Sequence, residues 1–355
     1  MKEIDITDWI SKTELEKRKM KIIKERDSFM IRSYKSIPVK FPRLLKIDHD
    51  LGIFVGLILT EGMQSKTKKS RNTFTLMNTD PDVIKVCLRL LESLFSIRPE
   101  IPKMAIYLPP SMKDNGIEVE KGWRRNLHID EHAEIKRYLQ KDLKRSKFSV
   151  FIYRSTFRFV TDIVIEESLK YLNEKEFRRG FLRGVFCAEG SVELRKKSLH
   201  FVNFSQCNDK NRSLIKKALM LSGIRFKERL NPHSKGIRIS HMDNFEKIDN
   251  LEICTISKRK QRKFKVGLLN LKKDPRAGRS VTQTKREIID ILGKRGQMTM
   301  NGISKELGLS YFTIWDHIFR KRGNVKGLFE EGALKCTNCY RPKGRPEKIL
   351  ELKEI

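Results

Sequence analysis

The sequence has little of what a membrane-spanning or secreted protein needs. No apolar run reaches the roughly 18 to 20 residues that a helix needs to cross a bilayer, and the longest, Leu51–Leu59, is interrupted by glycines. The N-terminus, MKEIDITDWISK, is polar throughout, so we expect no signal peptide. Six cysteines are scattered at positions 87, 187, 207, 254, 336 and 339. This density is too low for a disulfide scaffold, and we expect a reducing compartment: the cytoplasm, close to the nucleoid, or an organelle matrix.

Acidic residues are also scarce relative to basic ones. The 355 residues include 76 Lys and Arg but only 44 Asp and Glu, which gives a net charge of +32. So large an excess implies a polyanionic partner, either nucleic acid or an anionic membrane. Because the chain lacks a long apolar segment, nucleic acid is the favoured partner. At this length the chain can bury a substantial core and hold two or three domains.

Two glycine-containing segments share one layout and lie 128 positions apart (189 − 61). The first, Leu51–Gly62, is LGIFVGLILTEG, and the second, Arg179–Gly190, is RGFLRGVFCAEG. In both segments a small residue recurs at every fourth position, which places these residues on one stripe of a helix. They are Gly52, Gly56 and Thr60, then Gly180, Gly184 and Ala188. Such a stripe lets two backbones approach closely, so the pattern predicts two helices packed stripe to stripe.

Each stripe ends in an acid followed by glycine, at Glu61 and at Glu189. The C-terminal end of a helix already carries partial negative charge, so a carboxylate there is unfavourable and calls for a positive partner. Packing the two helices together would bring both carboxylates to one place. Paired carboxylates are hard oxygen ligands, and a divalent metal is the obvious candidate for the missing positive charge.

The order of predicted elements repeats around these segments. In the second half, the helix at 179–190 leads into two strands around a basic turn at 195–197, a helix that begins at 208–209, two more strands and a last helix. The first half follows the same order, with a helix that begins at Asn78-Thr79-Asp80-Pro81. We therefore predict an α+β fold made of tandem αββαββα repeats of about 130 residues.

Domain boundaries follow from composition. The predicted parts are an N-terminal helical extension (1–36), repeat 1 (37–176), repeat 2 (177–265), a basic linker (266–282), a small domain (283–341) and a basic tail (342–355). Within repeat 1, residues 97–130 are expected to form strands and a long loop, and 148–160 one long strand or a strand pair. The basic run between 257 and 287 is expected to contact phosphates.

The small domain has the spacing of a winged helix-turn-helix. One helix ends at Gly308, the next is capped by Ser310, and a hairpin wing is expected to turn at Glu331-Gly332. Phe312, Trp315 and Ile318 are expected to face the core of the domain. The expected DNA contacts of this domain are Ser310, Tyr311, Thr313 and Lys321. Cys336 and Cys339 form half of a zinc site, which has no second half in the sequence.

The two motifs, their spacing and the Asn78–Pro81 turn resemble the LAGLIDADG homing endonucleases in their single-chain, two-motif form. The resemblance covers about residues 37–265 and includes IPVKFPRLLKIDHDLGIFVGLILTEG, NTDPDVIKVCLRLLESLF and FRRGFLRGVFCAEGSV. It implies that the two striped helices form an interface with pseudo-twofold symmetry, and that two antiparallel sheets form a saddle over the DNA major groove. It also implies Mg²⁺ or Mn²⁺ held by Glu61 and Glu189, with Lys258 as the third catalytic candidate and Lys260 the next choice.

The function implied by the resemblance is a monomeric, site-specific, metal-dependent double-strand DNA endonuclease acting on a long asymmetric site, of the kind associated with intron or intein mobility. Polar and basic residues of the strands, with one lysine that follows them, would contact the DNA: Arg71, Thr73, Thr75, Arg195, Lys197, His200, Asn203 and Lys260. Two alternatives remain open. One is a non-cleaving transcription regulator on the same scaffold, and the other is a maturase that binds structured intron RNA. The presence of both glutamates argues against the regulator.

Overall fold

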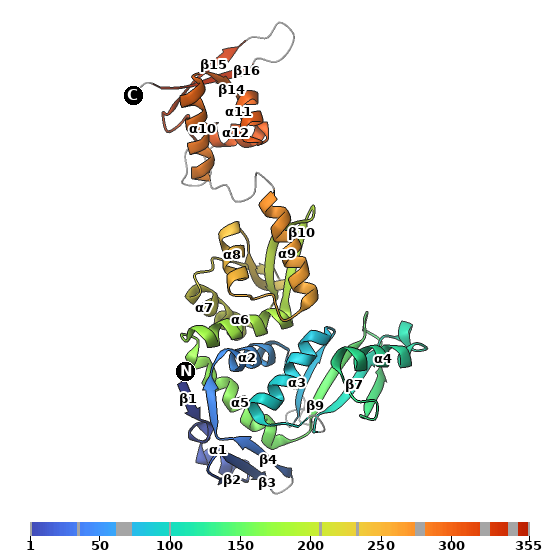
Figure 1. Ribbon diagram of the computed structural model, residues 1–355. Coiled ribbons are helices and arrows are strands. Elements are labelled where there is room, and N and C mark those ends of the chain that lie inside the picture. Colours follow the sequence, from blue (N-terminus) through green and yellow to red (C-terminus); the bar gives the residue numbers. More distant parts are fainter. Residues whose placement is uncertain are drawn as a thin grey trace. The chain divides into compact units, whose positions relative to one another are not determined.

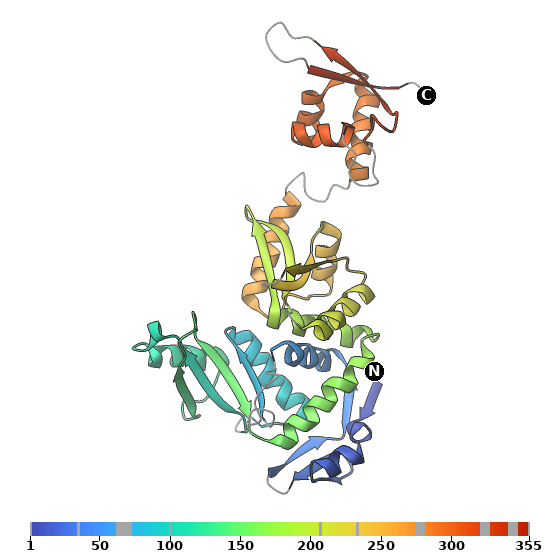
Figure 2. The ribbon, with the colours of Figure 1, turned by 180° about the vertical axis from the view of Figure 1, so that it is seen from behind.

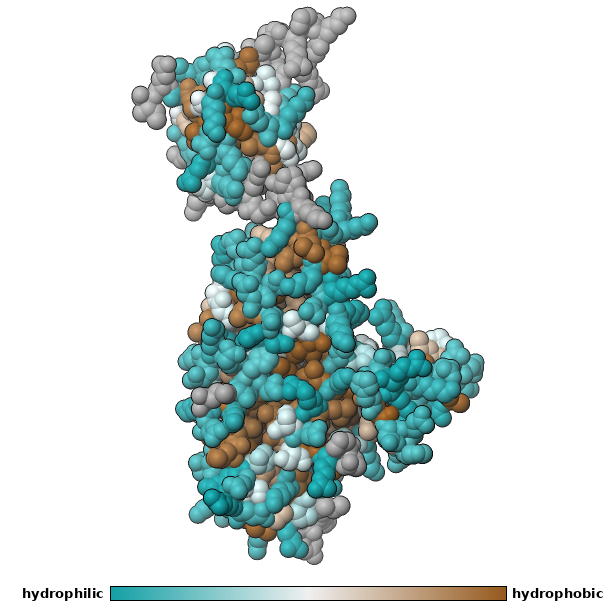
Figure 3. Space-filling model, viewed as in Figure 1, coloured by the Kyte–Doolittle hydropathy of each residue, from teal (hydrophilic) through white to brown (hydrophobic). Residues whose placement is uncertain are grey.

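The chain forms two compact units, Met1–Gly267 and Leu268–Ile355. The computed structural model in Figure 1 describes residues 2–33, 36–61, 73–98, 101–205, 208–231, 234–273, 281–319, 327–339 and 347–353. Within these ranges, no helix is long and apolar enough to cross a membrane. The visible surface is mostly hydrophilic (Figure 3), in keeping with a sequence in which 34% of the residues are charged.

The first unit opens mainly with strands, and the helical extension expected at 1–36 was wrong. The described elements here are β1 (Lys2–Asp5), η1 (Ile6–Trp9), α1 (Lys12–Lys17), β2 (Met20–Lys24), β3 (Ser28–Ser33), β4 (Ser36–Pro42) and β5 (Leu44–Ile47). β2, β3 and β4 form an antiparallel sheet in chain order, and β1 pairs with β5. Along β3 the buried side chains are Phe29 and Ile31, and this alternation is the period of a strand, although the surrounding charges suggested a helix.

Repeat 1 has the expected central elements and one insertion. Its elements are α2 (His49–Glu61), β6 (Phe74–Asn78), α3 (Pro81–Phe95), β7 (Lys103–Leu108), η3 (Pro110–Met112), α4 (Gly116–Leu127), β8 (Ile135–Leu139), β9 (Lys147–Ile152), α5 (Ser155–Ser168) and η4 (Leu169–Tyr171). The sheet order is β6-β9-β7-β8, and β8 is parallel to β7. The insertion α4–β8 therefore extends this sheet by one strand.

Two local predictions in repeat 1 were wrong. Residues 116–127 are a helix, because Trp123 and Leu127 lie one turn apart and are both buried, whereas the flanking Pro and Gly suggested a loop. In the 148–160 run the strand ends at Ile152, and α5 begins at Ser155. Its aromatic Phe157 is fully buried among Phe41, Phe74 and Phe95, so the aromatics that suggested one strand come from two elements.

Repeat 2 follows the predicted αββαββα order. Its elements are α6 (Lys175–Glu189), β10 (Gly190–Arg195), β11 (Ser198–Ser205), α7 (Asp209–Leu221), β12 (Lys227–Asn231), β13 (Ser234–Ile239) and α8 (Met242–Asn250). Its sheet has the order β10-β11-β13-β12 with antiparallel pairing. Figures 1 and 2 show α2 and α6 side by side in the middle of this unit, each leading into the elements of its own repeat. The predicted α+β class with tandem repeats is confirmed.

The basic run expected to be a linker is largely helical. α9 covers Lys258–Lys273, and residues 274–280 lie outside the described ranges. Lys and Arg are good helix formers, and the helix buries Phe264 and Leu268, one turn apart. Gly267 gives it room beside β11, since a Cβ there would lie 3.3 Å from the Cα of Leu199. The linker prediction was therefore wrong for the part that the structure describes.

The second unit is a three-helix domain with a small sheet. Its elements are α10 (Val281–Arg295), β14 (Met298–Thr299), α11 (Met300–Leu307), α12 (Tyr311–Phe319), β15 (Leu334–Cys339) and β16 (Glu347–Leu352). α11 ends at Leu307 and is capped by Gly308, whose φ is +62°, and α12 follows after Ser310, as the helix-turn-helix spacing predicted. The sheet order is β14-β16-β15. β15 and β16 are the strands in the position of the wing. The turn at Gly332 precedes both strands, so the prediction that the hairpin turns at Glu331-Gly332 was wrong.

Candidate metal and nucleic-acid site

The glycine stripes of α2 and α6 meet with twofold reciprocity. A Cβ on Gly52 would lie 2.1 Å from the carbonyl oxygen of Phe177, and one on Gly180 would lie 2.0 Å from that of His49. One turn further on, Gly56 and Gly184 make the matching approach at 2.2 Å to the opposite backbone. No other residue has room at these positions. The stripes therefore fix the crossing of the two helices, and with it the place where their acidic ends meet.

Glu61, the last residue of α2, lies at that meeting point. Asn78 at the end of β6 donates from Nδ2 to its Oε1 at 2.8 Å, and Asn78 Oδ1 accepts from the backbone of Asp80. Burial and the charge of Glu189 raise the pKa of Glu61 from 4.5 to about 7, against the opposing effects of Lys260, Lys147 and the Asn78 hydrogen bond. The surroundings of Glu61 thus favour its protonated form more than water does, and they leave the charged form only partly compensated.

Glu189 ends α6 in the equivalent position. Burial raises the pKa of its carboxyl, and the nearby Lys260 lowers it in part. The next residue, Gly190, explains the acid–glycine pair, because a Cβ there would lie 2.2 Å from the ring of Phe186. The chain can therefore turn directly from the acid into β10 only with glycine at this position.

Lys260 supplies the positive charge that a carboxylate at a helix end requires. Its Nζ donates to the backbone carbonyls of Phe186, Cys187 and Ala188 at 3.0, 2.7 and 3.4 Å, so it caps the last turn of α6. Burial lowers the pKa of this ammonium group. A cation at the C-terminal end of a helix offsets the helix dipole. This geometry favours Lys260 over Lys258 as the lysine of the site.

The turn that follows β6 holds this lysine in place from the other repeat. The backbone N–H of Lys258 donates to Asp82 Oδ2 at 2.8 Å, and the hydroxyl of Ser257 donates to Asp80 Oδ2 at 2.5 Å. Asp82 thereby accepts one of the N–H groups at the start of α9. The side chain of Lys258 itself is exposed. The Asn78–Asp82 segment, predicted only as a helix start, therefore braces both Glu61 and the helix that carries Lys260.

The two helix ends are capped differently. At the end of α2 the cap is neutral, because Asn211 of α7 donates from Nδ2 to the carbonyl of Leu59 at 2.9 Å. At the end of α6 the cap is the ammonium of Lys260. A second cation, Lys147 at the start of β9, lowers the pKa of Glu61 by its charge. Nothing in the sequence pattern marks Lys147, because only the pairing of β9 brings it near the acid.

The ligands that the two glutamates offer fit a hard divalent cation. Both are carboxylates at one place, and burial, the largest cause in each case, raises the pKa of both. Among the described residues no group of three or more His, Cys, Asp or Glu side chains could hold a metal. The protein would therefore supply two ligands, and water and phosphate oxygens the rest, which is the way Mg²⁺ is usually bound.

The open face of the second sheet carries several of the residues expected to contact DNA. Arg195 of β10 is exposed, and Lys197 lies in the two-residue turn that follows, where Lys196 and Lys197 have φ of +50° and +68°. His200 is exposed, and Asn203 is half-buried with its amide donating to Ser205 Oγ at 2.9 Å. These four residues lie on one hairpin, β10–β11, and the basic turn was correctly placed.

Arg238 on β13 is a residue of this face that sequence reasoning missed. It pairs with Asn203 across the ladder, so both side chains lie on the same side of the sheet. Its guanidinium lies 4.0 Å from the centre of the Phe201 ring, and its buried Nε has no hydrogen-bond partner in the described structure. A guanidinium held beside a ring suits a phosphate or a base edge.

The first sheet presents different residues from those predicted. Arg71 lies outside the described residues, Thr73 is half-buried and Thr75 is only 6% exposed, so Thr75 does not reach the surface. Along the same face, Lys103 pairs with Phe151 and Tyr107 with Lys147. Tyr107 also stacks on Tyr138 of β8 at 5.4 Å. The face is therefore aromatic and basic, and the α4–β8 insertion contributes to it.

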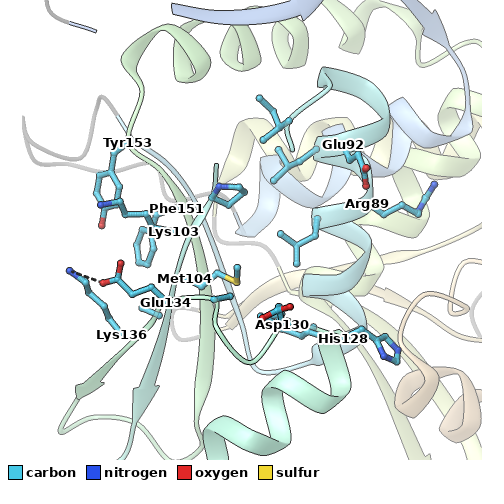
Figure 4. Close-up of a pocket in the computed structure, with 18 of the residues that line it drawn as sticks. Arg89, Glu92, Lys103, Met104, His128, Asp130, Glu134, Lys136, Phe151 and Tyr153 are labelled. Atoms are coloured by element: carbon cyan, nitrogen blue, oxygen red, sulfur yellow. Dashed lines mark ion pairs between the residues drawn. The ribbon is translucent and has the colours of Figure 1, made fainter. Parts of the chain in front are cut away.

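A cavity of about 1080 Å³ lies between α3 and the insertion. Figure 4 shows Arg89 and Glu92 on its α3 side and Glu134 paired with Lys136 (3.6 Å) on the other. Asp130 and Lys103 add further charges of both signs. This mixture selects no single class of ligand, and we leave the cavity outside the candidate site.

In the second unit the helix-turn-helix residues are placed differently from the prediction. Ser310 Oγ accepts from the backbone of Thr313 at 3.1 Å and lies 2.8 Å from the hydroxyl of Thr313, so both serve the helix cap. Ile318 is buried as expected, but Phe312 is 78% and Trp315 37% exposed, so their expected place in the core was wrong. The core position between them belongs to Ile314. Tyr311 is half-buried, and Lys321 lies outside the described residues.

The half zinc site gains no support from its surroundings. Cys336 is half-buried, and burial raises the pKa of its thiol, which disfavours the thiolate that a metal needs. The side chain of Cys339 lies outside the described part of the chain.

Comparison with known proteins gives likenesses in structure alone. No protein-family model matches the chain, and no curated protein matches it in sequence. Similar solved structures include the N-terminal LAGLIDADG domain of DUF199/WhiA, at 11% identity over 60% of this chain and 86% of that chain, with a TM-score of 0.37. Full-length DUF199/WhiA from Thermatoga maritima is 10% identical over 76% and 89% of the two chains, with a TM-score of 0.40.

A third likeness is to I-DmoI in complex with DNA and Ca, at 12% identity over 58% of this chain and 90% of that chain, with a TM-score of 0.33. The likeness is to LAGLIDADG proteins. At these low TM-scores, the fold assignment rests on the chain's own repeats and on the reciprocal contacts of α2 and α6.

Proposed function

We propose that the protein is a divalent-metal-dependent endonuclease that hydrolyses double-stranded DNA. The observation that carries the proposal is the pair Glu61 and Glu189, brought together at the ends of two crossing helices with the pKa of both carboxyls raised. A structural role alone does not explain two half-buried acids at neighbouring helix C-termini. Lys260 offsets their charge only in part, so their position stays costly unless a further cation joins them.

In this proposal Glu61 and Glu189 hold the metal. A bound Mg²⁺ would neutralise charge on the phosphate and lower the pKa of a coordinated water. Lys260 acts as a positioning residue, since its bonds to the last carbonyls of α6 fix the turn that presents Glu189. Asn78 plays the same part for Glu61 through its 2.8 Å hydrogen bond. Lys147, near Glu61, is the cation best placed to approach a phosphate.

The substrate proposed is a long and asymmetric duplex. The net charge of +32 suits a polyanion, and the open face of each sheet carries basic side chains. The two faces differ, because the first is aromatic and extended by the α4–β8 insertion, whereas the second presents Arg195, Asn203 and Arg238. Two unlike surfaces are expected to read two unlike half-sites. Because both repeats lie in one chain, a monomer would suffice.

The test is cleavage of a randomised duplex library by the full chain, with Mg²⁺ and with EDTA. We expect metal-dependent double-strand cuts at one motif, lost in Glu61→Gln and in Glu189→Gln. Glu176→Gln is the matched control, since it makes the same substitution at the exposed, opposite end of α6. Sequence-specific duplex binding without a cut in either buffer would instead identify a non-cleaving regulator, and selective binding of structured RNA would identify a maturase.

A further inference from the structure

The helix α12 presents an aromatic surface to solvent. Phe312 is 78% and Trp315 37% exposed, and Phe329, in the turn that follows α12, is 47% exposed. Phe319 joins them, because its ring centre lies 5.9 Å from that of Trp315 and 5.6 Å from that of Phe329. These four residues, Phe312, Trp315, Phe319 and Phe329, are the aromatic face. Exposed aromatic clusters of this kind usually mark a binding surface.

The composition of α12 does not suit the reading of duplex DNA. Its sequence, YFTIWDHIF, contains no Lys, Arg, Asn or Gln, the side chains that recognise base edges in the major groove. The hydroxyls of Ser310 and Thr313 are already bonded in the helix cap. Asp316 adds a negative charge one position along from Trp315. A helix that inserts into a groove between phosphates would be expected to carry basic side chains and not an acidic one.

One described cation lies beside the aromatic face, and the sequence of this part of the chain is basic overall. Lys348 places its ammonium 4.2 Å from the centre of the Phe319 ring. In the sequence from 268 to 355, Lys and Arg outnumber Asp and Glu by 19 to 10. Aromatic rings beside cations are the combination that binds single-stranded nucleic acid, in which bases stack on rings and phosphates meet the cations. An acidic environment would be expected for a basic partner, and a neutral one for an apolar protein partner.

We propose that the aromatic face of α12 binds unpaired nucleotides by base stacking, with Phe312 and Trp315 as the stacking residues. This site is separate from Glu61 and Glu189 and needs no metal. Single-stranded DNA and single-stranded RNA share the chemistry of recognition, and the same measurement distinguishes them.

The test uses the fluorescence of Trp315 in the full chain, in EDTA so that no cleavage occurs. The other tryptophans are Trp9 and Trp123, and Trp315→Phe gives their background signal. Oligonucleotides of about 12 nucleotides, which is within the site sizes of aromatic binding clefts, are titrated as single-stranded DNA, single-stranded RNA and duplex DNA. We expect saturable quenching of Trp315 by single strands and weak quenching by the duplex.

The variant Phe312→Ala should weaken single-strand affinity by about 5- to 100-fold, the usual effect of removing one stacking ring. Because Phe312 is 78% exposed, the variant should unfold at the wild-type temperature. Leu44→Ala, at a 55% exposed apolar residue of β5, is the control and should leave the quenching of Trp315 unchanged.

Three results would overturn the proposal. Equal or stronger quenching by duplex would make α12 a duplex-reading helix. Unchanged affinity in Phe312→Ala would remove the aromatic face from binding. Burial of Trp315 on raising the protein concentration, without any response to nucleic acid, would identify a protein contact. Because the fluorescence is measured in EDTA, its result does not depend on DNA cleavage. The proposed nuclease function could therefore be wrong while the single-strand binding proposal holds, and the reverse.

Discussion

At the scale of the residue, the site is a problem of charge compensation. Two carboxylates end two helices, and the structure compensates them only in part, with Lys260 at one end and Asn78 at the other. The residue-scale predictions therefore concern what happens when one charge of this group is removed.

Glu61→Gln should stabilise the metal-free protein at high pH. The folded pKa of Glu61 is about 7, above the ordinary 4.5, so the native state holds a proton that the unfolded chain releases between these values. Stability attributable to this group is therefore intact below about pH 4.5, falls as pH rises and is lowest above pH 7. In EDTA the variant should be more stable than the wild type by about 2 kcal/mol at pH 8 and equal to it near pH 4.5, as measured by urea unfolding. An equal gain at both pH values would contradict the assigned cause.

Lys260→Met should destabilise the protein by about 1 to 3 kcal/mol, because it leaves buried carbonyls without donors and an acid without its cation. Lys258→Met, two residues away with an exposed side chain, is the control and should change the unfolding free energy by less than about 0.5 kcal/mol. Thermal or urea unfolding of both variants measures the difference. Equal losses would show that the α6 cap is not specific to Lys260.

At the scale of the element, the crossing of α2 and α6 depends on glycine. At Gly184 a Cβ would lie 2.2 Å from the carbonyl oxygen of Ile53, so Gly184→Ala has to push the two helices apart. We expect a loss of at least about 2 kcal/mol, because overpacking displaces backbone and not merely a flexible side chain. Gly122→Ala is the control: it lies inside α4 with nothing within 4 Å of its Cβ and should gain about 0.5 to 1 kcal/mol from helix propensity. Urea midpoints that move together would contradict the close-packing account.

The elements best predicted from sequence are those whose pattern is local. The striped helices, the Asn78–Pro81 helix start and the Gly308–Ser310 turn all follow from residues at fixed offsets. α4 was not predicted because the glycines of this segment suggested a loop, and its buried Trp123 was not recognised as a core residue. α9 was not predicted because its run of basic residues suggested a linker, although Phe264 is buried. The prediction of one strand or a strand pair at 148–160 was wrong for a related reason. Alternating aromatic residues do not show where a strand ends and a helix begins.

The site itself was predictable only in part. Glu61 and Glu189 follow from the repeated motif, but Lys260 could not be separated from Lys258 without the register of α9. Lys147 and Arg238 reach their places through sheet pairing between distant segments, which no local pattern records. Phe312 and Trp315 were assigned to a core because they are aromatic, whereas the helical phase places Ile314 and Ile318 inside.

At the scale of the whole molecule, a strongly basic chain carries two unlike repeats and one acidic centre between them. The reciprocal contacts of α2 and α6 show that the repeats share a geometry, and their caps show that they differ in charge. The fold is consistent with a regulator as well as with a nuclease, so the decisive property is whether the acidic centre takes up a metal. That property can be measured without knowing the DNA target.

The most direct measurement titrates Mn²⁺ into the full chain at pH 8 and follows free Mn²⁺ by electron paramagnetic resonance. The account predicts a site in the wild type and in Glu176→Gln that is lost in both Glu61→Gln and Glu189→Gln, with competition by Mg²⁺. Binding that persists in either of these two variants, or its absence from the wild type, would contradict the claim that Glu61 and Glu189 hold a metal between them.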